Sequence, residues 1–413
     1  MPPKAQKGIT PVSSTSFAPD RSISQADPWD PVVLRNPLNF QHALREAGPV
    51  VQLEKYGIFA MGRYQQVHAA LSNWQAFQSG AGVGMSNFRT EKPWRPPSVV
   101  AEADPPHHDS TRDAIMKVLE PRALGKLAKD WAADADELVE DLLSRTTEFD
   151  LMTDLARVFP LRIFPDAIGL PQEGRENLLP YSEHAFNTFG PPNDLVAQAA
   201  PHMPEIAAWV AAQCRREVLT EDGFGAQLYA AADRGDITEQ HAPLLIRSLI
   251  TAGVDTTVIG LGALLTLFAQ NPDQWAHMRQ DPALMRTAFD EAVRLDSPVQ
   301  MIFRTTTQDI EVEGTFIPEG HKVLLVLASA NRDPRRWADP DSFDLKRDPS
   351  GHVGFGMGIH QCVGQHIARL EASAVLTALA SRVETIEIAG PVERRLNNTL
   401  RGWESVPVRV RLA

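Results

Sequence analysis

A glycine-rich segment near the end of the chain presents one cysteine in a position where its sulfur could act as a thiolate. The segment reads His352-Val-Gly-Phe-Gly-Met-Gly-Ile-His-Gln-Cys362-Val-Gly364, and the pattern predicts a helix directly after it. Free N–H groups and the dipole at a helix N-terminus stabilise a thiolate. Gly356 and Gly364 permit close backbone approaches that a Cβ would block. From these residues alone, Cys362 is a metal ligand, a nucleophile or a buried structural thiol.

The number of cysteines narrows these alternatives. The 413 residues contain two cysteines, Cys214 and Cys362. Two cysteines are too few for a zinc site, and these two do not form a Cys-x-x-Cys redox motif.

Phe355 is expected to cover the sulfur of Cys362 on one side. His352 and His360 are expected to donate hydrogen bonds to nearby anionic groups. Two distant cysteines without an export signal indicate reduced thiols, so we expect a cytoplasmic protein.

A second group of reactive side chains interrupts the most apolar segment of the chain. It reads Ala252-Gly-Val-Asp255-Thr256-Thr within a helix expected over residues 239–270. Buried polar groups are unfavourable unless they are paired. Thr256 can donate back to the carbonyl of Ala252 and bend the helix, and Gly253 makes that bend easier. The residues alone allow a kinked helix with a salt-bridged Asp255, or a site that moves protons.

A third pattern is Glu291-Ala-Val-Arg294. Residues three apart share one face of a helix, so the carboxylate and the guanidinium can pair. Taken alone, this pattern is as compatible with a surface ion pair as with a structural one.

The elements that must position these residues are mostly helical. Apolar residues recur at helical spacing in many segments, which predicts helices over 40–46, 64–71, 121–145, 151–168, 173–187, 201–216, 239–270, 272–281, 282–296 and 365–382. Strands are expected at 50–54, 57–62, 310–312, 315–317, 322–327 and 406–412. The fold class is therefore mainly α with small β-sheets. We expect a flexible N-terminal arm at 1–27 and a single domain at 28–413.

Charge and hydropathy exclude two kinds of partner. The formal net charge is -12, which argues against sequence-independent binding to nucleic acid or to an anionic membrane surface. No uninterrupted apolar run reaches the roughly 18 residues that a membrane span needs.

The cysteine segment resembles the haem-binding loop of cytochromes P450, Phe-Gly-x-Gly-x-His-x-Cys-x-Gly. The other two patterns resemble P450 motifs in the same order along the chain, from about Asn36 to Ala413. The resemblance implies the P450 fold, haem b held by the Cys362 thiolate, and oxygen activation by Asp255 and Thr256. It makes Glu291 and Arg294 a structural pair. Ser342 stands where a third arginine is usual, and the substitutes considered are Arg332, Arg335 and Arg336.

The same resemblance assigns partners for the haem and its carboxylates. The implied contacts are His108, Arg112, Ala252, Arg304, His352, Phe355, Gly356, His360 and Gly364.

A finer resemblance connects the chain to bacterial P450s that oxidise para-substituted benzoic acids. It rests on residues 91–98, 186–193 and 245–248. It implies that Arg95, Ser98 and Ser248 bind the substrate carboxylate with Arg247 nearby, that Phe186 and Phe189 enclose the ring, that Ile302 shapes the space over the iron, and that Tyr181 closes the entrance. The expected reaction is O-demethylation of a 4-methoxybenzoate-type acid with O2. Electrons would come from a [2Fe–2S] ferredoxin and its reductase, because no flavin or iron–sulfur motif is present.

Several alternatives stay open at this point. Arg247 could pair with Glu239, and the phenylalanines could be ordinary core residues. The substrate could be a neutral terpene, a fatty acid or another aromatic compound. A haem carrier or sensor without catalysis is the alternative from another class, although it would not need the Asp255–Thr256 pair.

Overall fold

The computed structural model describes residues 23–413. Most of the predicted flexible arm at 1–27 therefore lies outside the described residues. The last part of that range packs on the fold, because Ile23–Gln25 forms a 3-10 turn and Ala26 is buried.

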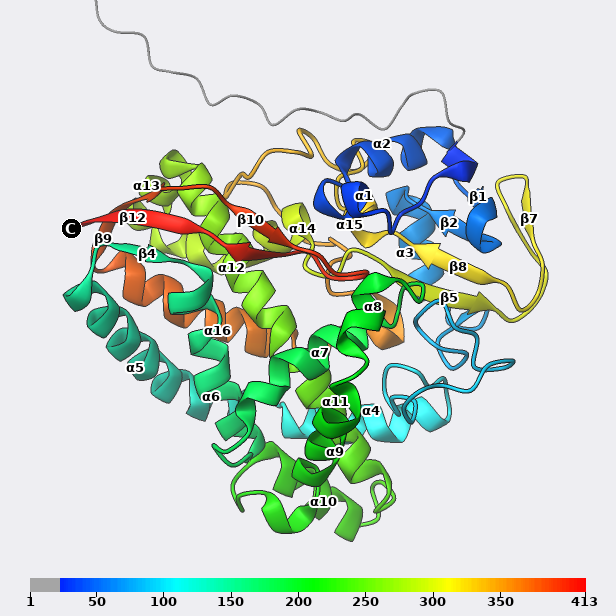
Figure 1. The fold of residues 1–413 in the computed structure, drawn as a ribbon, viewed down its shortest axis with the longest axis horizontal. Helices are drawn as coiled ribbons and strands as arrows, with labels where there is room; N and C mark the ends of the chain where they lie inside the picture. The colour runs from blue at the N-terminus through cyan, green and yellow to red at the C-terminus, as the bar shows by residue number, and fades with distance from the viewer. Residues whose placement is uncertain (1–22) are drawn as a thin grey trace, which may run out of the picture.

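Helices form most of the molecule (Figure 1). In chain order they are α1 Pro31–Arg35, α2 Leu38–Ala47, α3 Tyr64–Ser72, α4 His107–Val118, α5 Pro121–Arg145, α6 Val158–Ile168, α7 Leu178–Asn187, α8 Asp194–Ala199, α9 Met203–Gln213, α10 Phe224–Asp233, α11 His241–Gly253, α12 Asp255–Gln270, α13 Pro272–Gln280, α14 Met285–Asp296, α15 Leu327–Ala330 and α16 Gln365–Ala380. The expected mainly α architecture is confirmed.

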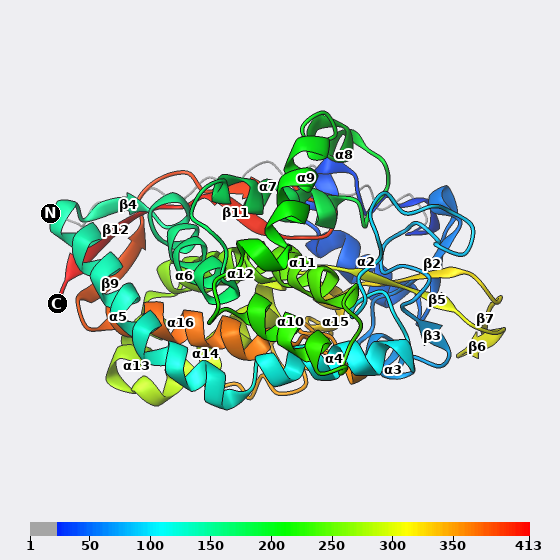
Figure 2. The ribbon, with the colours of Figure 1, turned by 90° about the horizontal axis from the view of Figure 1, so that it is seen from below.

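The strands form small sheets toward the two ends of the molecule, and the β10-β11 pair lies between them (Figures 1 and 2). They are β1 Val51–Leu53, β2 Ile58–Met61, β3 Phe77–Gln78, β4 Glu148–Asp150, β5 Ile302–Thr306, β6 Ile310–Val312, β7 Thr315–Ile317, β8 Lys322–Leu325, β9 Val383–Ile388, β10 Glu393–Arg395, β11 Gly402–Ser405 and β12 Pro407–Leu412. The largest sheet has the order β1-β2-β8-β5-β3, in which β2 and β8 run parallel and the other pairs antiparallel. A three-stranded sheet, β4-β12-β9, lies at the opposite end.

The core is organised around α12, which packs against α14 and α16, while α16 packs against α5. Leu261, Leu264 and Leu265 of α12 are fully buried. The segment His241–Gln270 is long and apolar enough to cross a membrane, but 78% of its most apolar window is buried inside the protein. It is the central helix of a folded core.

The helix predicted over 239–270 is broken in two at Val254, where ψ is -67° and the regular helix stops. The Thr256 hydroxyl donates to the Ala252 carbonyl at 2.6 Å, the back-bond expected from the sequence. Gly253 is needed for packing, in addition to the flexibility expected from the sequence. A Cβ there would lie 2.2 Å from the ring of Phe164, so only glycine fits without rearrangement.

Three described elements near the site were not expected from the pattern. Strand β5 lies inside the largest sheet and pairs with both β8 and β3. Its alternation is masked because the buried Arg304 stands at one of its apolar positions. Helices α8 and α10 are short, with six and ten residues.

Candidate active site

Tight turns before α16 hold Cys362 at the start of that helix. The Cys362 N–H donates to the carbonyl of Phe355 at 2.8 Å. Gly356 and Gly358 both have a φ of +68°, in the left-handed region that strains residues with a side chain. The backbone N–H of Gly364 donates to the sulfur and favours its ionised form.

Electrostatics distinguish Cys362 from Cys214. Burial raises the pKa of the Cys362 thiol, while Arg112 and Arg369 oppose this effect by attracting the thiolate. A bound metal cation would hold such a sulfur in the ionised state. Burial raises the pKa of Cys214 to about 12, and only Arg247 opposes it. Cys362 is also the more exposed of the two thiols. It therefore has the cationic surroundings and the access that metal ligation needs.

Two histidine rings with unsatisfied nitrogens lie beside the cysteine loop. The rings of His108 and His360 meet edge to face with centroids 4.6 Å apart. His108 Nε2 and both ring nitrogens of His360 are buried and have no hydrogen-bond partner among the described residues. The carboxylate of Asp104 is 3.7 Å from His360, too far for a good hydrogen bond. Buried donors without acceptors indicate that an external acceptor belongs here.

Two arginines add positive charge without acidic partners. Arg304 is fully buried and donates to the carbonyl of Phe303 at 2.9 Å. Burial lowers its pKa to about 10, against a weak opposing effect of Asp104. Arg112 lies on α4 one turn after His108 and forms no ion pair within residues 23–413; burial lowers its pKa as well. Together these groups form a cationic surface suited to anionic ligands.

His352 lies next to an anionic group, Asp290, as the sequence led us to expect. Its Nε2 lies 3.2 Å from Asp290 Oδ1, and its Nδ1 accepts from the Gly354 N–H at 3.1 Å. Asp290 also accepts from Arg369 at 2.8 Å. Burial raises the pKa of Asp290, but His352 and Arg369 outweigh this effect and the net shift is downward. The guanidinium of Arg369 also lies over the ring of Phe355, at 4.9 Å. His352 therefore belongs to an ion-pair cluster separate from His108 and His360.

The junction of α11 and α12 has a solvent-accessible strip. Ala252 is exposed and Thr256 half-buried, although Ile250 and Val254 on the same helical segment are fully buried. The Thr256 hydroxyl lies at this exposed strip.

Asp255 is completely buried and forms an ion pair. Its Oδ1 accepts from Arg395 Nη2 at 2.7 Å, while its Oδ2 has no partner in the described part of the chain. Burial raises the pKa of Asp255, and the charge of Arg395 opposes this rise. The salt-bridged aspartate considered from the sequence is therefore present. Its role in moving protons stays a prediction.

The Glu291–Arg294 pair is fully buried, which excludes the surface alternative. Arg294 Nε and Nη2 donate to Glu291 at 2.7 and 2.9 Å. The third arginine is Arg347, whose Nε donates to Glu291 Oε1 at 3.0 Å. Arg347 also donates to the Ser342 hydroxyl at 3.1 Å. None of the three substitutes considered from the sequence takes this position.

Those three arginines have other partners. Arg332 pairs with Asp341 at 2.6 Å, and Arg335 pairs with Asp333 and Glu46. The guanidinium of Arg336 lies over the ring of Trp337.

Two serines predicted to bind substrate meet at one point. Ser98 Oγ, from the loop before α4, lies 3.0 Å from Ser248 Oγ on α11. Ser248 donates to the carbonyl of Leu244 at 2.9 Å, so Ser98 is the donor in the contact between the two hydroxyls. Arg247 Nη2 donates to the carbonyl of Pro96 at 2.7 Å, and burial lowers the pKa of its guanidinium. This contact replaces the pairing with Glu239 that the sequence left open.

Arg95 is joined to an acid that the sequence did not single out. Its Nη1 and Nη2 donate to Glu102 at 2.8 and 3.3 Å. Glu102 also accepts from the Ser98 N–H at 2.7 Å and is almost completely buried. With Arg95 and Arg247 against Glu102, this region carries a net charge of +1.

The aromatic residues predicted to contact substrate lie on α7 and in the turn after it. The rings of Phe186 and Phe189 meet edge to face, 5.4 Å apart. Tyr181 is buried beneath Trp94, which is 46% exposed and whose ring is 6.5 Å away. Ile302 is half-buried at the first position of β5. Helices α7 and α11, which carry several of the predicted substrate residues, contact each other directly.

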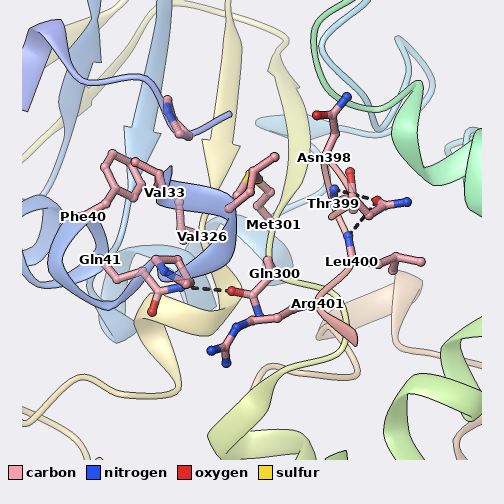
Figure 3. A pocket seen from close by; sticks show the side chains of 14 residues that line it. Val33, Phe40, Gln41, Gln300, Met301, Val326, Asn398, Thr399, Leu400 and Arg401 are labelled. Atoms are coloured by element: carbon pink, nitrogen blue, oxygen red, sulfur yellow. Dashed lines mark hydrogen bonds between the residues drawn. The ribbon is translucent and has the colours of Figure 1, made fainter. Parts of the chain in front are cut away.

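A small cavity elsewhere is too small to be a substrate site. It measures about 10 Å³ and lies between the N-terminal helices and residues 397–401 (Figure 3). Gln41 and Gln300 line it and are joined by a hydrogen bond of 3.1 Å. That volume holds about one water molecule.

Comparison with known proteins decides the family. A Rhodopseudomonas palustris protein named cytochrome P450 CYP199A2 is 53% identical over 388 residues, 93% of each chain. This chain is a cytochrome P450. The family model "Cytochrome P450" matches residues 220–388. The structure of cytochrome P450 CYP109Q5 from Chondromyces apiculatus superposes with a TM-score of 0.80 at 31% identity, covering 95% of this chain and 100% of that one.

A second solved P450 is informative through its ligand. Cytochrome P450 CREJ, in complex with (4-ethylphenyl) dihydrogen phosphate, superposes with a TM-score of 0.83 at 25% identity, covering 94% of this chain and 100% of that one.

Membership makes the protein a monooxygenase that binds haem b through a cysteine thiolate and uses O2 and external redox partners. The residues present fit that cofactor. The partly exposed Cys362 matches the thiolate, and the unpartnered donors of His108 and His360 match the two carboxylates of haem. The uncompensated charges of Arg112 and Arg304 match the same groups.

Sequence reasoning missed three residues that the site uses. They are Glu102, Arg347 and Arg395, which are the partners of Arg95, Glu291 and Asp255. Glu102 lies close enough in sequence to be found as an acid following a predicted anion-binding loop. The other two are 56 and 140 positions away from their partners, and no local pattern signals such pairs.

Proposed function

We propose that this P450 removes the methyl group from a 4-methoxybenzoate-type acid, giving the phenol and formaldehyde. The observation that carries the proposal is the meeting of Ser98 and Ser248 at 3.0 Å beside Arg247 and the Arg95–Glu102 pair. In this proposal the Ser98 and Ser248 hydroxyls turn from their present acceptors to donate to the carboxylate, and a net charge of +1 favours an anion over a neutral molecule. The complex of the related CREJ protein with a para-substituted aromatic phosphate supports a substrate of this general shape.

Binding of the substrate carboxylate at one end of the ring determines which carbon at the other end reacts. Ser98 and Ser248 bind the carboxylate, and Phe186 and Phe189 contact the ring. Ala252 and Ile302 then border the para substituent. Holding a substrate by both ends converts binding into orientation, which is worth several kcal/mol, roughly 7–11 in the best intramolecular cases.

Bound through Cys362, haem supplies reductive activation of dioxygen. His108, Arg112, Arg304 and His360 would hold its carboxylates, and Phe355, Gly356 and Gly364 would contact it from the cysteine loop. His352, the remaining predicted haem contact in this loop, pairs with Asp290.

The chain's own residues supply the protons. Asp255 is the buried carboxyl that exchanges protons, and Thr256 orients the hydrogen bond at the exposed strip of the central helix. Two electrons and two protons reduce one oxygen atom of O2 to water, and the other oxygen enters the methoxy carbon. The resulting hemiacetal loses formaldehyde.

A [2Fe–2S] ferredoxin and its reductase supply the electrons in this proposal, and the cytoplasm is the expected compartment. The test is a Soret titration of the purified haem protein with 4-methoxybenzoic acid and with uncharged 4-methoxybenzamide. The proposal expects a low- to high-spin shift with the acid alone. An equal shift with the amide, or a shift only with neutral terpenes, would contradict it.

A further inference from the structure

A buried acid organises the loop that carries two of the proposed substrate-binding residues. Glu102 lies in the loop before α4, and its side chain is 1% exposed. Its Oε2 accepts from Arg95 Nη1 at 2.8 Å and from the Ser98 N–H at 2.7 Å, and its Oε1 accepts from Arg95 Nη2 at 3.3 Å. The Glu102 N–H donates in turn to the Ser98 carbonyl at 2.9 Å. One carboxylate therefore fixes both the guanidinium of Arg95 and the backbone of Ser98.

The same loop presents a second guanidinium and an unused donor. Arg247, on α11, donates to the carbonyls of Pro96 and Pro97 at 2.7 and 3.3 Å. The Nε of Arg95 is buried and has no hydrogen-bond partner within residues 23–413. A buried donor without an acceptor indicates that an external acceptor belongs nearby. Two guanidinium groups thus meet at this loop, and the Glu102 carboxylate pairs with only one of them.

The other titratable groups around this loop are mostly neutral at pH 8. Burial raises the pKa of Tyr181, and it raises the pKa of Cys214 to about 12, so these two neighbours of Arg247 carry no charge. Lys322 is a further cation near Glu102, but burial lowers its pKa to about 7. Two guanidinium groups and one carboxylate remain, which gives a net charge of +1.

This charge matches a ligand with one negative charge. A monoanion neutralises the loop, whereas a dianion leaves a net charge of -1 there, and an unbalanced charge in a buried place is unfavourable. Without the charge of Glu102 the same groups would carry +2 and would favour a dianion. Because Coulomb energy is proportional to the charge of the ligand, any change in the charge of the loop acts twice as strongly on a dianion.

We propose that Glu102 determines the charge of the ligands that this P450 accepts: it holds Arg95 and Ser98 in place and restricts the pocket to monoanions such as carboxylates, against dianions such as aryl phosphates. Glu102 does not touch the substrate in this account. It acts through Arg95 and Ser98, and it is a positioning residue. The inference rests on the carboxylate pocket of the proposed function, but not on O-demethylation as the reaction.

The test compares two ligands of the same shape that differ by one charge. 4-Methylphenyl sulfate is a monoanion, and 4-methylphenyl phosphate is a dianion at pH 8, because the second pKa of a phosphate ester is about 6. The ester oxygen lengthens the anionic end by one atom and the methyl group shortens the other end, so both ligands match the length of 4-methoxybenzoate. The Kd values are measured by calorimetric titration of the haem-loaded protein at low ionic strength, where screening is weak.

Glu102→Gln removes the charge and disturbs the loop least. An amide oxygen in the place of Oε2 keeps the two shorter hydrogen bonds, to Arg95 and Ser98, and loses only the one of 3.3 Å. The wild type should bind the sulfate more tightly than the phosphate. In Glu102→Gln the Kd of the sulfate should fall about threefold and that of the phosphate about tenfold, because the second ligand carries twice the charge. Equal changes for the two ligands, or no change, would overturn the proposal.

Three further variants control for structural effects. Glu102→Asp keeps the charge and should keep the wild-type ratio of the two Kd values. Glu91→Gln removes an exposed charge from the same loop and should change neither Kd. Arg247→Gln lowers the net charge to zero, so the Kd of the sulfate should rise about threefold and that of the phosphate about tenfold. This variant decides the question if Glu102→Gln does not fold, and an unchanged ratio in it would overturn the proposal.

The outcomes separate this inference from the proposed function. If 4-methoxybenzoic acid shifts the spin state but Glu102→Gln leaves the phosphate-to-sulfate ratio unchanged, the carboxylate pocket stands and the role of Glu102 fails. If the ratio changes as expected but the acid causes no spin shift, the proposed substrate fails and the role of Glu102 stands. If neither the sulfate nor the phosphate binds to any of these proteins, the proposal is overturned.

Discussion

Replacing Arg347 with alanine should destabilise the protein and weaken haem retention. Arg347 makes four hydrogen bonds, to Glu291, Ala338, Asp339 and Ser342, at 3.0, 2.5, 3.0 and 3.1 Å. Glu291 is completely buried, and it loses one of its two guanidinium partners in this variant.

The structure bounds the size of the effect. Breaking a buried ion pair costs about 3–5 kcal/mol when the partner charge is left alone. Here Arg294 still donates twice to Glu291, and the Asp344 N–H donates once at 3.2 Å. Solvent can also hydrate the exposed carbonyls that Arg347 releases. We therefore expect a loss of about 3 kcal/mol, at the lower end of that range.

The measurement is urea denaturation of the haem-loaded variants, together with haem content after dialysis. Arg347→Lys should lose less than Arg347→Ala, because its ammonium can still reach part of the set of acceptors. Arg336→Ala is the control, since its exposed guanidinium lies on Trp337 and forms no ion pair in the described structure. Equal stability of Arg347→Ala and wild type, or a larger loss in Arg336→Ala, would refute the assignment of Arg347 as the third arginine.

Three further predictions test other parts of the account. Ser98→Ala and Ser248→Ala should each raise the Kd for 4-methoxybenzoate by about tenfold. Because the two hydroxyls contact each other, the rise in Kd for the double variant should be smaller than the product of the two single effects. A rise equal to that product would argue against a joint site. Gly253→Ala should lower the free energy of unfolding by about 1–3 kcal/mol, because the added Cβ would lie 2.2 Å from the Phe164 ring. An unchanged urea midpoint would disprove that contact. Burial lowers the pKa of Lys322 to about 7, below its ordinary value of 10.5. Unfolding therefore takes up a proton between these pH values, and stability should rise from about pH 7 to pH 10 relative to Lys322→Met; parallel pH profiles would contradict this.

Local sequence patterns predicted the parts of the fold that depend on local interactions. Helical periodicity gave α5 with its observed bounds, because a long amphipathic helix carries its signal in every turn. The bend at Val254 followed from the capacity of Thr256 to bond four residues back, which needs no tertiary information. The turns around Cys362 followed from glycines, two of which do occupy the left-handed region.

The parts that sequence could not predict depend on contacts between distant segments. Arg347 reaches Glu291 only because the chain between them folds back over α14, and Ser342 contributes a hydroxyl where an arginine was expected. Arg95 was assigned to the substrate, yet the buried Glu102 holds it. Gly253 was explained by flexibility, whereas its necessity comes from the ring of Phe164, which lies far away in sequence.

The most direct test of the central claim is product analysis with the purified P450, a [2Fe–2S] ferredoxin, its reductase and NADH. The account predicts that 4-methoxybenzoic acid is converted to 4-hydroxybenzoic acid with one formaldehyde per acid consumed, and that Cys362→Ser abolishes both products. NADH consumption without either product, or efficient conversion of 4-methoxybenzamide instead of the acid, would contradict a carboxylate-anchored demethylation.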